Sequence, residues 1–341
     1  MRVTDVSAQQ SPDAMKAVVH HVYGSPDALD IREIDKPAPA DDEVLIRVHA
    51  AALNAADAFL LSGEPFAVRA MAGGLRRPRT NHVLGRAVAG QIEAVGMSVA
   101  GLEVGDHVYA ECAGTLAGYV RAPERFVAPK PAALSFEQAA TIPVAATAAL
   151  QGLRDRGQVR AGQRVLINGA SGGVGTFAVQ IAAWLGARVT GVCSTRNVDL
   201  VRSIGADDVI DYTAQDFTTA EQRYDVILDL VGNHSLAALR RALAPTGTLV
   251  LSSGGGGRWL GPARRIASAF VVAPFVRQRL RPFAATQDKR DLILLKELAE
   301  SGAIRPVIDR TYPLGHAVEA MRYLGQGHVA GKLVIIMNDA H

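Results

Sequence analysis

A glycine-rich turn between two apolar segments is the part of this sequence whose residue spacing most clearly indicates chemistry. Residues 170–175, Ala-Ser-Gly-Gly-Val-Gly, match the pattern G-x-G-x-x-G with alanine in the first glycine position. An apolar run at Arg164–Ile167 predicts a buried strand before the turn, and Val174–Leu185 follows with helical periodicity. Because a helix amino terminus offers free N–H groups and a partial positive charge, this arrangement predicts a site for the phosphates of a dinucleotide.

The residues of this turn have different expected roles. Ser171, Gly172, Gly173, Val174 and Gly175 are the predicted phosphate-binding residues. Gly172 would let the backbone approach a pyrophosphate, and Gly175 would let the helix pack closely on the strand. The alternative is an ordinary strand-to-helix turn that needs glycine only for its conformation.

Residues 191–196, Gly-Val-Cys-Ser-Thr-Arg, bear on the choice between NAD and NADP. They follow the second predicted strand, about twenty residues after the turn, where an NAD enzyme places an acidic residue for the ribose hydroxyls. This segment has no acid. Ser194 and Thr195 beside Arg196 suit a 2′-phosphate, because arginine binds phosphate through two hydrogen bonds and stays charged. The segment therefore predicts NADPH, unless it is only a helix cap beside a solvated arginine.

The elements that must position these residues can be predicted from periodicity. After Ser135, strands and helices alternate, which implies a parallel, doubly wound sheet. Its further strands are predicted at 188–192, 208–210, 224–228 and 248–251, and its helices at 139–153, 197–204 and 235–243. Strands rich in β-branched residues are predicted earlier, in a compact β-barrel-like module, at 16–20, 29–34, 43–51 and 88–95. A helix at 291–301 and strands around Val307 and at 332–337 are predicted to close the chain.

Composition narrows the class of protein. The chain has 341 residues, which suggests two domains, and 49% of them are hydrophobic and 20% charged, as in ordinary soluble globular proteins. A net charge of +3 is too small to indicate nucleic-acid binding. Two cysteines exclude a disulfide framework. Residues 1–14 are predicted to be a disordered leader, and they lack the apolar core of a signal peptide. No run reaches the ~20 apolar residues of a membrane span. We therefore expect a cytoplasmic protein with no integral membrane segment.

Several further motifs in this order resemble the medium-chain dehydrogenase/reductase superfamily, from about Met15 to Met337. They are Ala52-Leu-Asn-Ala-Ala-Asp57, Gly85-Arg-Ala-Val-Ala-Gly90, Ile142-Pro143, Thr147-Ala148, Gly205-Ala-Asp-Asp-Val-Ile-Asp-Tyr212, Asp229-Leu-Val-Gly232 and Gly331-Lys332. Among its branches, the chain is most similar to the zinc-independent quinone oxidoreductases and the reticulon-4-interacting-protein-like reductases. The resemblance implies an α/β protein with a GroES-like β-barrel catalytic domain at 15–137, a Rossmann cofactor domain at 138–284 and a return to the catalytic domain at 285–341. It also implies a homodimer that pairs through the edge strand of the cofactor sheet.

The same resemblance implies roles for residues near the nicotinamide. Asn54 is the candidate to orient the nicotinamide or the substrate, although asparagine is also common in turns. Thr147 would contact the nicotinamide end, or its hydroxyl would satisfy a carbonyl one helical turn earlier. For Asp57 we expect a helix cap rather than a proton shuttle.

Four more residues are implied along the rest of the cofactor. Tyr212 would lie near the adenosine, or would be a core tyrosine at a strand end. Lys332 would approach the phosphates, or would be an exposed lysine at a strand start. Val231 and Gly232 fall at the carboxyl edge of the sheet, where ligands of doubly wound folds bind.

The sequence argues against a metal. Zinc alcohol dehydrogenases of this superfamily carry a cysteine before the Asn54 turn and Gly-His-Glu where this chain has Gly85-Arg86-Ala87. Cys112 and Cys193 cannot build a zinc site alone. Ala87 and Gly118 also depart from the family pattern, and Pro65 and Phe66 stand near the position of the tyrosine that enoyl-reductase relatives carry as a possible proton donor. No strong general acid stands out, so solvent is the expected source of the proton.

Two classes of function are compatible with these residues. The main hypothesis is a zinc-independent NADPH-dependent reductase that passes hydride to a quinone or an α,β-unsaturated carbonyl. The other is a redox-sensing or structural protein that binds NADPH without turnover. A short-chain dehydrogenase is excluded, since no tyrosine has a lysine four residues later. Residues 258–281, with six arginines among apolar clusters, could form a lid, a dimer contact or a membrane-facing surface.

Overall fold

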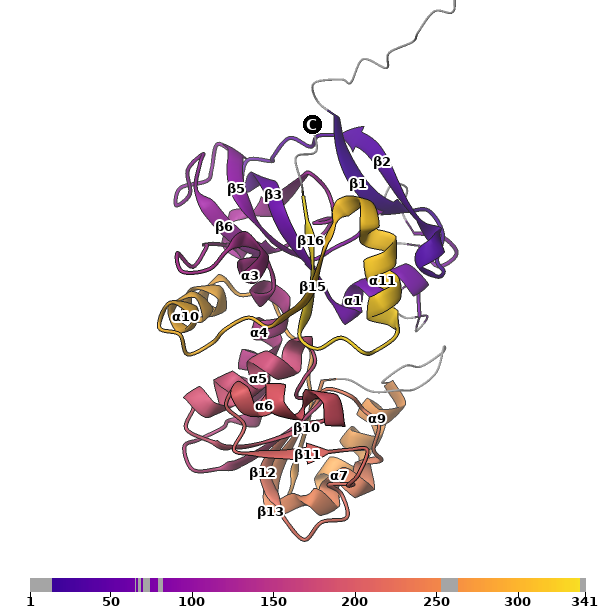
Figure 1. The fold of residues 1–341 in the computed structure, drawn as a ribbon, viewed down its shortest axis with the longest axis vertical. Helices are drawn as coiled ribbons and strands as arrows, with labels where there is room; N and C mark the ends of the chain where they lie inside the picture. The colour runs from indigo at the N-terminus through magenta and orange to yellow at the C-terminus, as the bar shows by residue number, and fades with distance from the viewer. Residues whose placement is uncertain are drawn as a thin grey trace, which may run out of the picture.

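Two bodies of secondary structure follow one another along the long axis of the molecule (Figure 1). The structure is a computed structural model that describes residues 14–64, 66, 69, 74–78, 82–252 and 263–337. The predicted leader lies outside the described residues, apart from Ala14, which begins the first strand. None of the helices within these ranges is both long enough and apolar enough to cross a membrane.

The first body is built on strands from both ends of the chain. A seven-stranded sheet has the order β15-β16-β3-β5-β6-β8, with β7 paired to β3, and a smaller sheet has the order β2-β1-β4. The strands are β1 (Ala14–His20), β2 (Leu29–Asp35), β3 (Glu43–Leu53), β4 (His82–Val83), β5 (Ala87–Val95), β6 (His107–Glu111), β7 (Tyr119–Pro123), β8 (Val127–Pro129), β15 (Ile308–Pro313) and β16 (Lys332–Ile336). Because β16 pairs antiparallel with β3, Leu333 lies opposite Leu53, and the start of β16 lies beside the turn after β3.

Helices border this body on several sides. They are α1 (Ala55–Ser62), α3 (Phe136–Ala140), α10 (Lys289–Glu300) and α11 (Ala317–Gly325). α1 follows β3 directly and packs against α11, so the turn that carries Asn54 is held from two sides.

The second body contains a six-stranded sheet of the order β11-β10-β9-β12-β13-β14, and every neighbouring pair is parallel. Its strands are β9 (Arg164–Asn168), β10 (Arg188–Cys193), β11 (Asp208–Asp211), β12 (Tyr224–Asp229), β13 (Leu243–Leu251) and β14 (Arg279–Pro282). Its helices are α4 (Ile142–Gln151), α5 (Gly173–Trp184), α6 (Val198–Ser203), α7 (Leu236–Ala242) and α9 (Ala263–Val272). The chain runs outward from β9 to β11 and then returns to β12 on the other side of β9, so the strand order reverses there. Ligands of doubly wound sheets bind at such a reversal.

These elements confirm the doubly wound sheet and most of the predicted strands, but two predictions need correction. The single helix predicted at 139–153 is broken at Thr141, and α4 restarts with Pro143 in its first turn, because proline cannot donate to a preceding turn. The arginine-rich segment contains α9 and a sixth strand, β14. The predicted domain limits at 138 and 284 stay a prediction.

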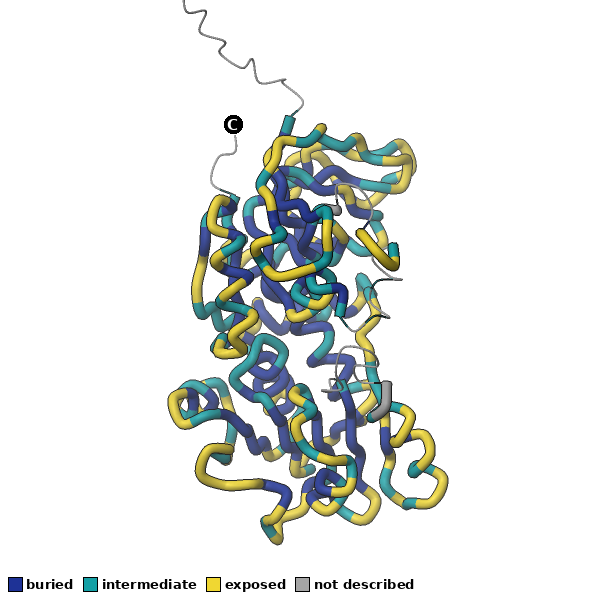
Figure 2. The backbone as a smooth tube through the Cα atoms, turned by 90° about the vertical axis from the view of Figure 1, so that its right-hand side faces the viewer, coloured by how far each residue is buried: buried dark blue, intermediate teal, exposed yellow. Residues whose placement is uncertain are grey.

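One hydrophobic core joins the two bodies. It contains Ala52 and Val334 from the seven-stranded sheet together with Val165 and Ile167 from the six-stranded sheet. α4 lies between them and buries most of its side chains (Figure 1). Buried backbone accordingly runs through the centre of both bodies in Figure 2. The two sheets are therefore held together by apolar packing, and a cavity remains at one side of the contact.

Candidate cofactor and active site

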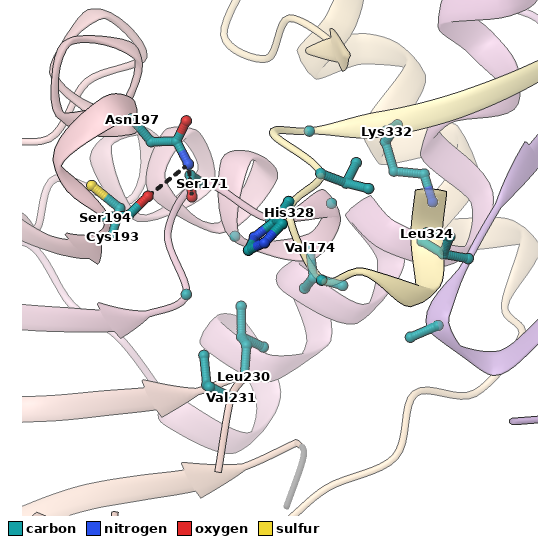
Figure 3. A pocket seen from close by; sticks show the side chains of 18 of the residues that line it. Ser171, Val174, Cys193, Ser194, Asn197, Leu230, Val231, Leu324, His328 and Lys332 are labelled. Atoms are coloured by element: carbon teal, nitrogen blue, oxygen red, sulfur yellow. Dashed lines mark hydrogen bonds between the residues drawn. The ribbon is translucent and has the colours of Figure 1, made fainter. Parts of the chain in front are cut away.

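A cavity of about 720 Å³ lies where the two bodies meet (Figure 3). Its floor is formed by the carboxyl ends of β9, β10 and β12, the reversal point of the parallel sheet. Its opposite wall comes from the turn after β3 and from residues 324–333, which lead into β16. The volume lies within the range of about 300–1,000 Å³ that is typical of ligand pockets.

The glycine turn forms one wall of the cavity. Ser171, Gly172, Gly173, Val174 and Gly175 all line it, and α5 begins at Gly173 with Gly172 as its N-cap residue. A Cβ atom on Gly175 would lie 2.0 Å from the carbonyl oxygen of Gly169, so only glycine permits this approach of helix and turn. A Cβ on Gly172 would have no atom nearer than 3.5 Å, which leaves its cavity side open. The first N–H groups of α5 have no partner within the helix and suit an anion.

The end of β10 supplies the predicted 2′-phosphate residues. Ser194 and Arg196 line the cavity, as does Tyr212, whose side chain is exposed rather than in the core. Arg196 Nη2 donates to the carbonyl oxygen of His328 at 2.7 Å, across the cavity from one body to the other. These residues place a cation, a hydroxyl and an aromatic ring at the same end of the cavity.

Thr195 does not line the cavity, and its contact with the cofactor stays a prediction. Its Oγ1 donates to Asp211 Oδ2 at 2.6 Å. Hydrogen bonds from Thr195 and Thr213 lower the pKa of Asp211, so this carboxylate is ionised. The acid is missing from residues 191–196 but stands on the neighbouring strand, opposite Cys193. Because hydroxyl groups from Thr195 and Thr213 already bind both of its oxygens, Asp211 is engaged away from the cavity.

Two residues of this region were not predicted from the sequence. Asn197 is buried, and its Nδ2 donates to Ser171 Oγ at 3.0 Å and to Ser194 Oγ at 3.4 Å, which ties the glycine turn to the end of β10 (Figure 3). His328 also lines the cavity, on the side opposite the parallel sheet (Figure 3). Asn197 was predicted only as the start of a helix, and no local motif marks His328.

The turn after β12 is held by a buried carboxylate. Val231 lines the cavity, whereas Gly232 does not. The backbone N–H of Gly232 donates to Asp229 Oδ1 at 3.1 Å, and its φ of +77° favours glycine in this turn, whereas its contact with the cofactor stays a prediction. Asn168 Nδ2 donates to the same Asp229 oxygen at 2.8 Å, and Arg265 of α9 pairs with the other.

Thr147 is separated from the other predicted residues. It faces a second, small cavity with Glu111 and Gln287, and its Oγ1 has no hydrogen-bond partner among the described residues. The alternative bond to a carbonyl of its own helix is therefore not formed, and the nicotinamide contact stays a prediction. From the same helix it is Val144 that lines the main cavity.

Asn54, Asp57 and Lys332 form a buried polar group at the catalytic-domain wall. Asp57 caps α1 as predicted, because its Oδ2 accepts from the Asn54 backbone N–H at 2.8 Å. Lys332 is 3% exposed, which excludes the alternative of an exposed lysine. Its Nζ donates to the carbonyl oxygen of Leu53 at 2.6 Å and to Asn54 Oδ1. Asn54 and Lys332 both line the cavity.

Comparison with known proteins is consistent with this geometry. Residues 40–132 match the family described as alcohol dehydrogenase GroES-like domain, and residues 204–335 match the family described as zinc-binding dehydrogenase. A 2-methylene-furan-3-one reductase of Solanum lycopersicum is 33% identical over 345 residues, covering 95% of this chain and 79% of that protein. The chain belongs to the medium-chain dehydrogenase/reductase superfamily.

Other members of the superfamily place it in the quinone oxidoreductase branch. The chloroplastic NADPH-dependent alkenal/one oxidoreductase of Arabidopsis thaliana is 33% identical over 97% of this chain and 82% of its own length. The quinone oxidoreductase from Coxiella burnetii superposes with a TM-score of 0.83 at 29% identity, over 95% of this chain and all of that one. The predicted GroES-like and Rossmann-like architecture is confirmed.

Proposed function

We propose that this protein is an NADPH-dependent, zinc-independent oxidoreductase that reduces a quinone or an α,β-unsaturated carbonyl. The observation that carries the proposal is a single cavity lined by the glycine turn, by Ser194 and Arg196, and by Asn54 and Lys332 from the other body. The relatives from tomato and Arabidopsis are named as a furanone reductase and an NADPH-dependent alkenal/one oxidoreductase. Both names refer to redox chemistry of an unsaturated carbonyl compound.

The residues of the chain have distinct tasks in this reaction. The amino terminus of α5 binds the pyrophosphate, Ser194 and Arg196 bind the 2′-phosphate, and the exposed ring of Tyr212 packs on the adenine. NADPH supplies the hydride when bound. Asn54 orients the nicotinamide or the acceptor beside it. Apolar side chains of the cavity exclude water, so that holding donor and acceptor together accounts for much of the rate. These are Leu53, Val144, Leu230, Val231 and Leu324.

The side chains near the family's zinc position support chemistry without a metal. Arg86 stands there and forms an ion pair with Glu111 at 2.7 Å. Burial raises the pKa of Cys112 to about 12 and that of Cys193 to about 11, and the two thiols lie in different hydrophobic cores, so they do not form a pair of ligands. Within the described ranges, no three His, Cys, Asp or Glu side chains are grouped as a metal site requires.

The proposal is tested by following absorbance of the reduced nicotinamide with NADPH and NADH in parallel, against a panel of small quinones and an alkenal. Acceptor-dependent oxidation that strongly favours NADPH would support it. Equal rates with the two cofactors would refute the 2′-phosphate site but not the reductase. Tight binding of NADPH without oxidation by any acceptor would favour the alternative, a protein that binds NADPH without turnover.

A homodimer and a cytoplasmic location belong to the same proposal. β14 is at one edge of the six-stranded sheet and pairs with β13 alone among the described strands, which leaves an edge for a second copy. Two buried free cysteines fit a reducing compartment. Sedimentation equilibrium tests the dimer, and a monomer at all concentrations would refute it.

A further inference from the structure

Lys332 occupies an unusual position for a lysine. Its side chain is buried at the cavity wall, because Gly331 turns the chain with a φ of +92° and the pairing of β16 with β3 then directs Lys332 to the turn after β3. A Cβ on Gly331 would lie 2.4 Å from the carbonyl oxygen of Val307, so this turn requires glycine. The fold therefore holds an ammonium group at the cavity wall, between the turn after β3 and the glycine turn, where a Cβ on Gly173 would lie 3.8 Å from Lys332 Nζ.

The hydrogen bonds of Lys332 leave one donor for a ligand. An ammonium has three N–H groups. Two are used by the carbonyl oxygen of Leu53, at 2.6 Å, and by Asn54 Oδ1. Asn54 also donates from its Nδ2 to the carbonyl oxygen of Ala52 at 2.9 Å, which fixes the orientation of its amide. The amide oxygen of Asn54 thus holds the ammonium in place while both side chains line the cavity.

Burial of Lys332, opposed in part by the charge of Asp57, favours release of a proton near neutral pH. Burial lowers the pKa of Lys332 to about 8, and the negative charge of Asp57 acts against that shift. Burial raises the pKa of Asp57 to about 6, so Asp57 is ionised above that pH, and its Oδ1 has no hydrogen-bond partner among the described residues. The other charged group that acts on Asp57 is Arg86, which is already paired with Glu111. General acids work best when their pKa lies near the operating pH.

We propose that Lys332 is the proton donor of the reduction. Its hydrogen bond to Asn54 positions the ammonium group, and the negative charge of Asp57 favours the protonated form. The inference rests on the proposed function. It assigns a proton donor to a chain that has no tyrosine where enoyl-reductase relatives carry one. Hydride from NADPH forms a C–H bond at the β-carbon of the acceptor, and the electron pair of the C=C bond moves to give an enolate. An N–H bond of Lys332 then breaks and its proton forms the C–H bond at the α-carbon. Neutral Lys332 regains a proton from water after the product leaves.

Replacing Lys332 separates this role from a simple phosphate contact. The experiment compares wild type with Lys332→Gln and Lys332→Arg, the second of which keeps the charge but does not release a proton near neutral pH. Lys130→Gln is the matched control, because Lys130 is a partly buried lysine that donates to backbone carbonyls of Pro131 and Leu134 and does not line the cavity. The readouts are Kd for NADPH by fluorescence, kcat, and the enantiomer ratio at the α-carbon when an α-methyl cyclic enone is reduced.

We expect wild type and Lys130→Gln to give one enantiomer, because a fixed donor protonates one face. Lys332→Arg keeps the charge and should bind NADPH as wild type does. Both Lys332 variants should lose about 100-fold or more in kcat and give a nearly racemic product through protonation by water. A weaker Kd for NADPH with kcat and enantiomer ratio retained would overturn the proposal and leave a phosphate contact. A racemic product from wild type would also overturn it. If wild type oxidises no NADPH with any acceptor, the proposed function itself fails, and this inference with it.

The pH dependence gives a readout that a structural role would not change. The protonated form is required, so kcat/KM for the enone in wild type should fall by about tenfold per pH unit above the Lys332 pKa, at about 8 or higher because bound phosphates favour the cation. Asp57→Asn removes the charge that supports the ammonium, so this descending limb should move to lower pH. It should be absent in Lys332→Gln. An unchanged limb in either variant would contradict the assignment.

Discussion

Substitution of Gly175 by alanine tests whether the glycine turn is built for close packing as well as for phosphate. The new Cβ would lie 2.0 Å from the carbonyl oxygen of Gly169 and 2.8 Å from backbone atoms of Ala170. Real Cβ contacts are essentially never under 3.0 Å, and the obstacle is backbone, so the first turn of α5 must retreat by about 1 Å. Overpacking of this kind typically costs about 1–3 kcal/mol of stability.

The same movement should weaken cofactor binding, because the N–H groups of α5 leave their positions. We expect Gly175→Ala to lower the free energy of unfolding, measured with urea, by about 1–3 kcal/mol and to raise Kd for NADPH by at least about tenfold. Gly172→Ala is the contrasting variant: its Cβ has 3.5 Å of clearance, so stability is kept, but the methyl group intrudes where the pyrophosphate approaches, so Kd rises. Gly315→Ala, with no atom within 4 Å, controls for the general effect of alanine. Wild-type stability and affinity in Gly175→Ala would refute this account of the turn.

Three further predictions concern the cofactor and the buried ion pair. Arg196→Gln should raise KM for NADPH by about 10–100-fold and leave KM for NADH unchanged, because a charge-assisted pair with the 2′-phosphate is lost. Equal effects on KM for both cofactors would contradict the assignment of Arg196 to the 2′-phosphate. Arg265→Ala should lower the free energy of unfolding by about 3–5 kcal/mol, because Asp229 is fully buried and would keep an unpaired charge, and Asp229→Asn in the same chain should restore part of it. NADPH at one hundred times its Kd should add about 2.7 kcal/mol to the free energy of unfolding of wild type. Arg196→Gln at the same NADPH concentration should be stabilised less. An unchanged melting temperature of wild type would exclude binding.

Local patterns were sufficient to predict most of the parallel sheet. β9 and α5 flank a turn whose conformation depends on its glycines, so the spacing of the glycines was enough to predict the glycine turn that forms one wall of the cavity. β14 was missed because its one buried side chain, Leu280, stands between two exposed arginines and gives no apolar run. The break at Thr141 was missed because alanine-rich periodicity continues through it, although Pro143 marked a restart.

The contacts across the cavity could not be predicted in the same way. Lys332 and Asn54 are far apart in the sequence, and they meet because β16 joins the sheet beside β3 in one particular register. Arg196 reaches His328 for a similar reason, through the loop that precedes β16. Thr147 shows the converse, since its place on α4 was predicted but the rotation of the helix turns it to a different cavity. Spacing predicts local shape, whereas register and helix rotation depend on the packing of the whole molecule.

The central claim is hydride transfer from NADPH to a conjugated acceptor bound in the cavity between the two bodies. The most direct test supplies NADPH deuterated at the transferring position, together with an alkenal, and determines by mass spectrometry and NMR where the deuterium is found. The account predicts one deuterium at the β-carbon of the product from wild type, and much less product from Gly175→Ala under the same conditions. Two results together would contradict it: NADPH binds tightly but no deuterium enters any product of the alkenal, and quinones leave the cofactor unoxidised.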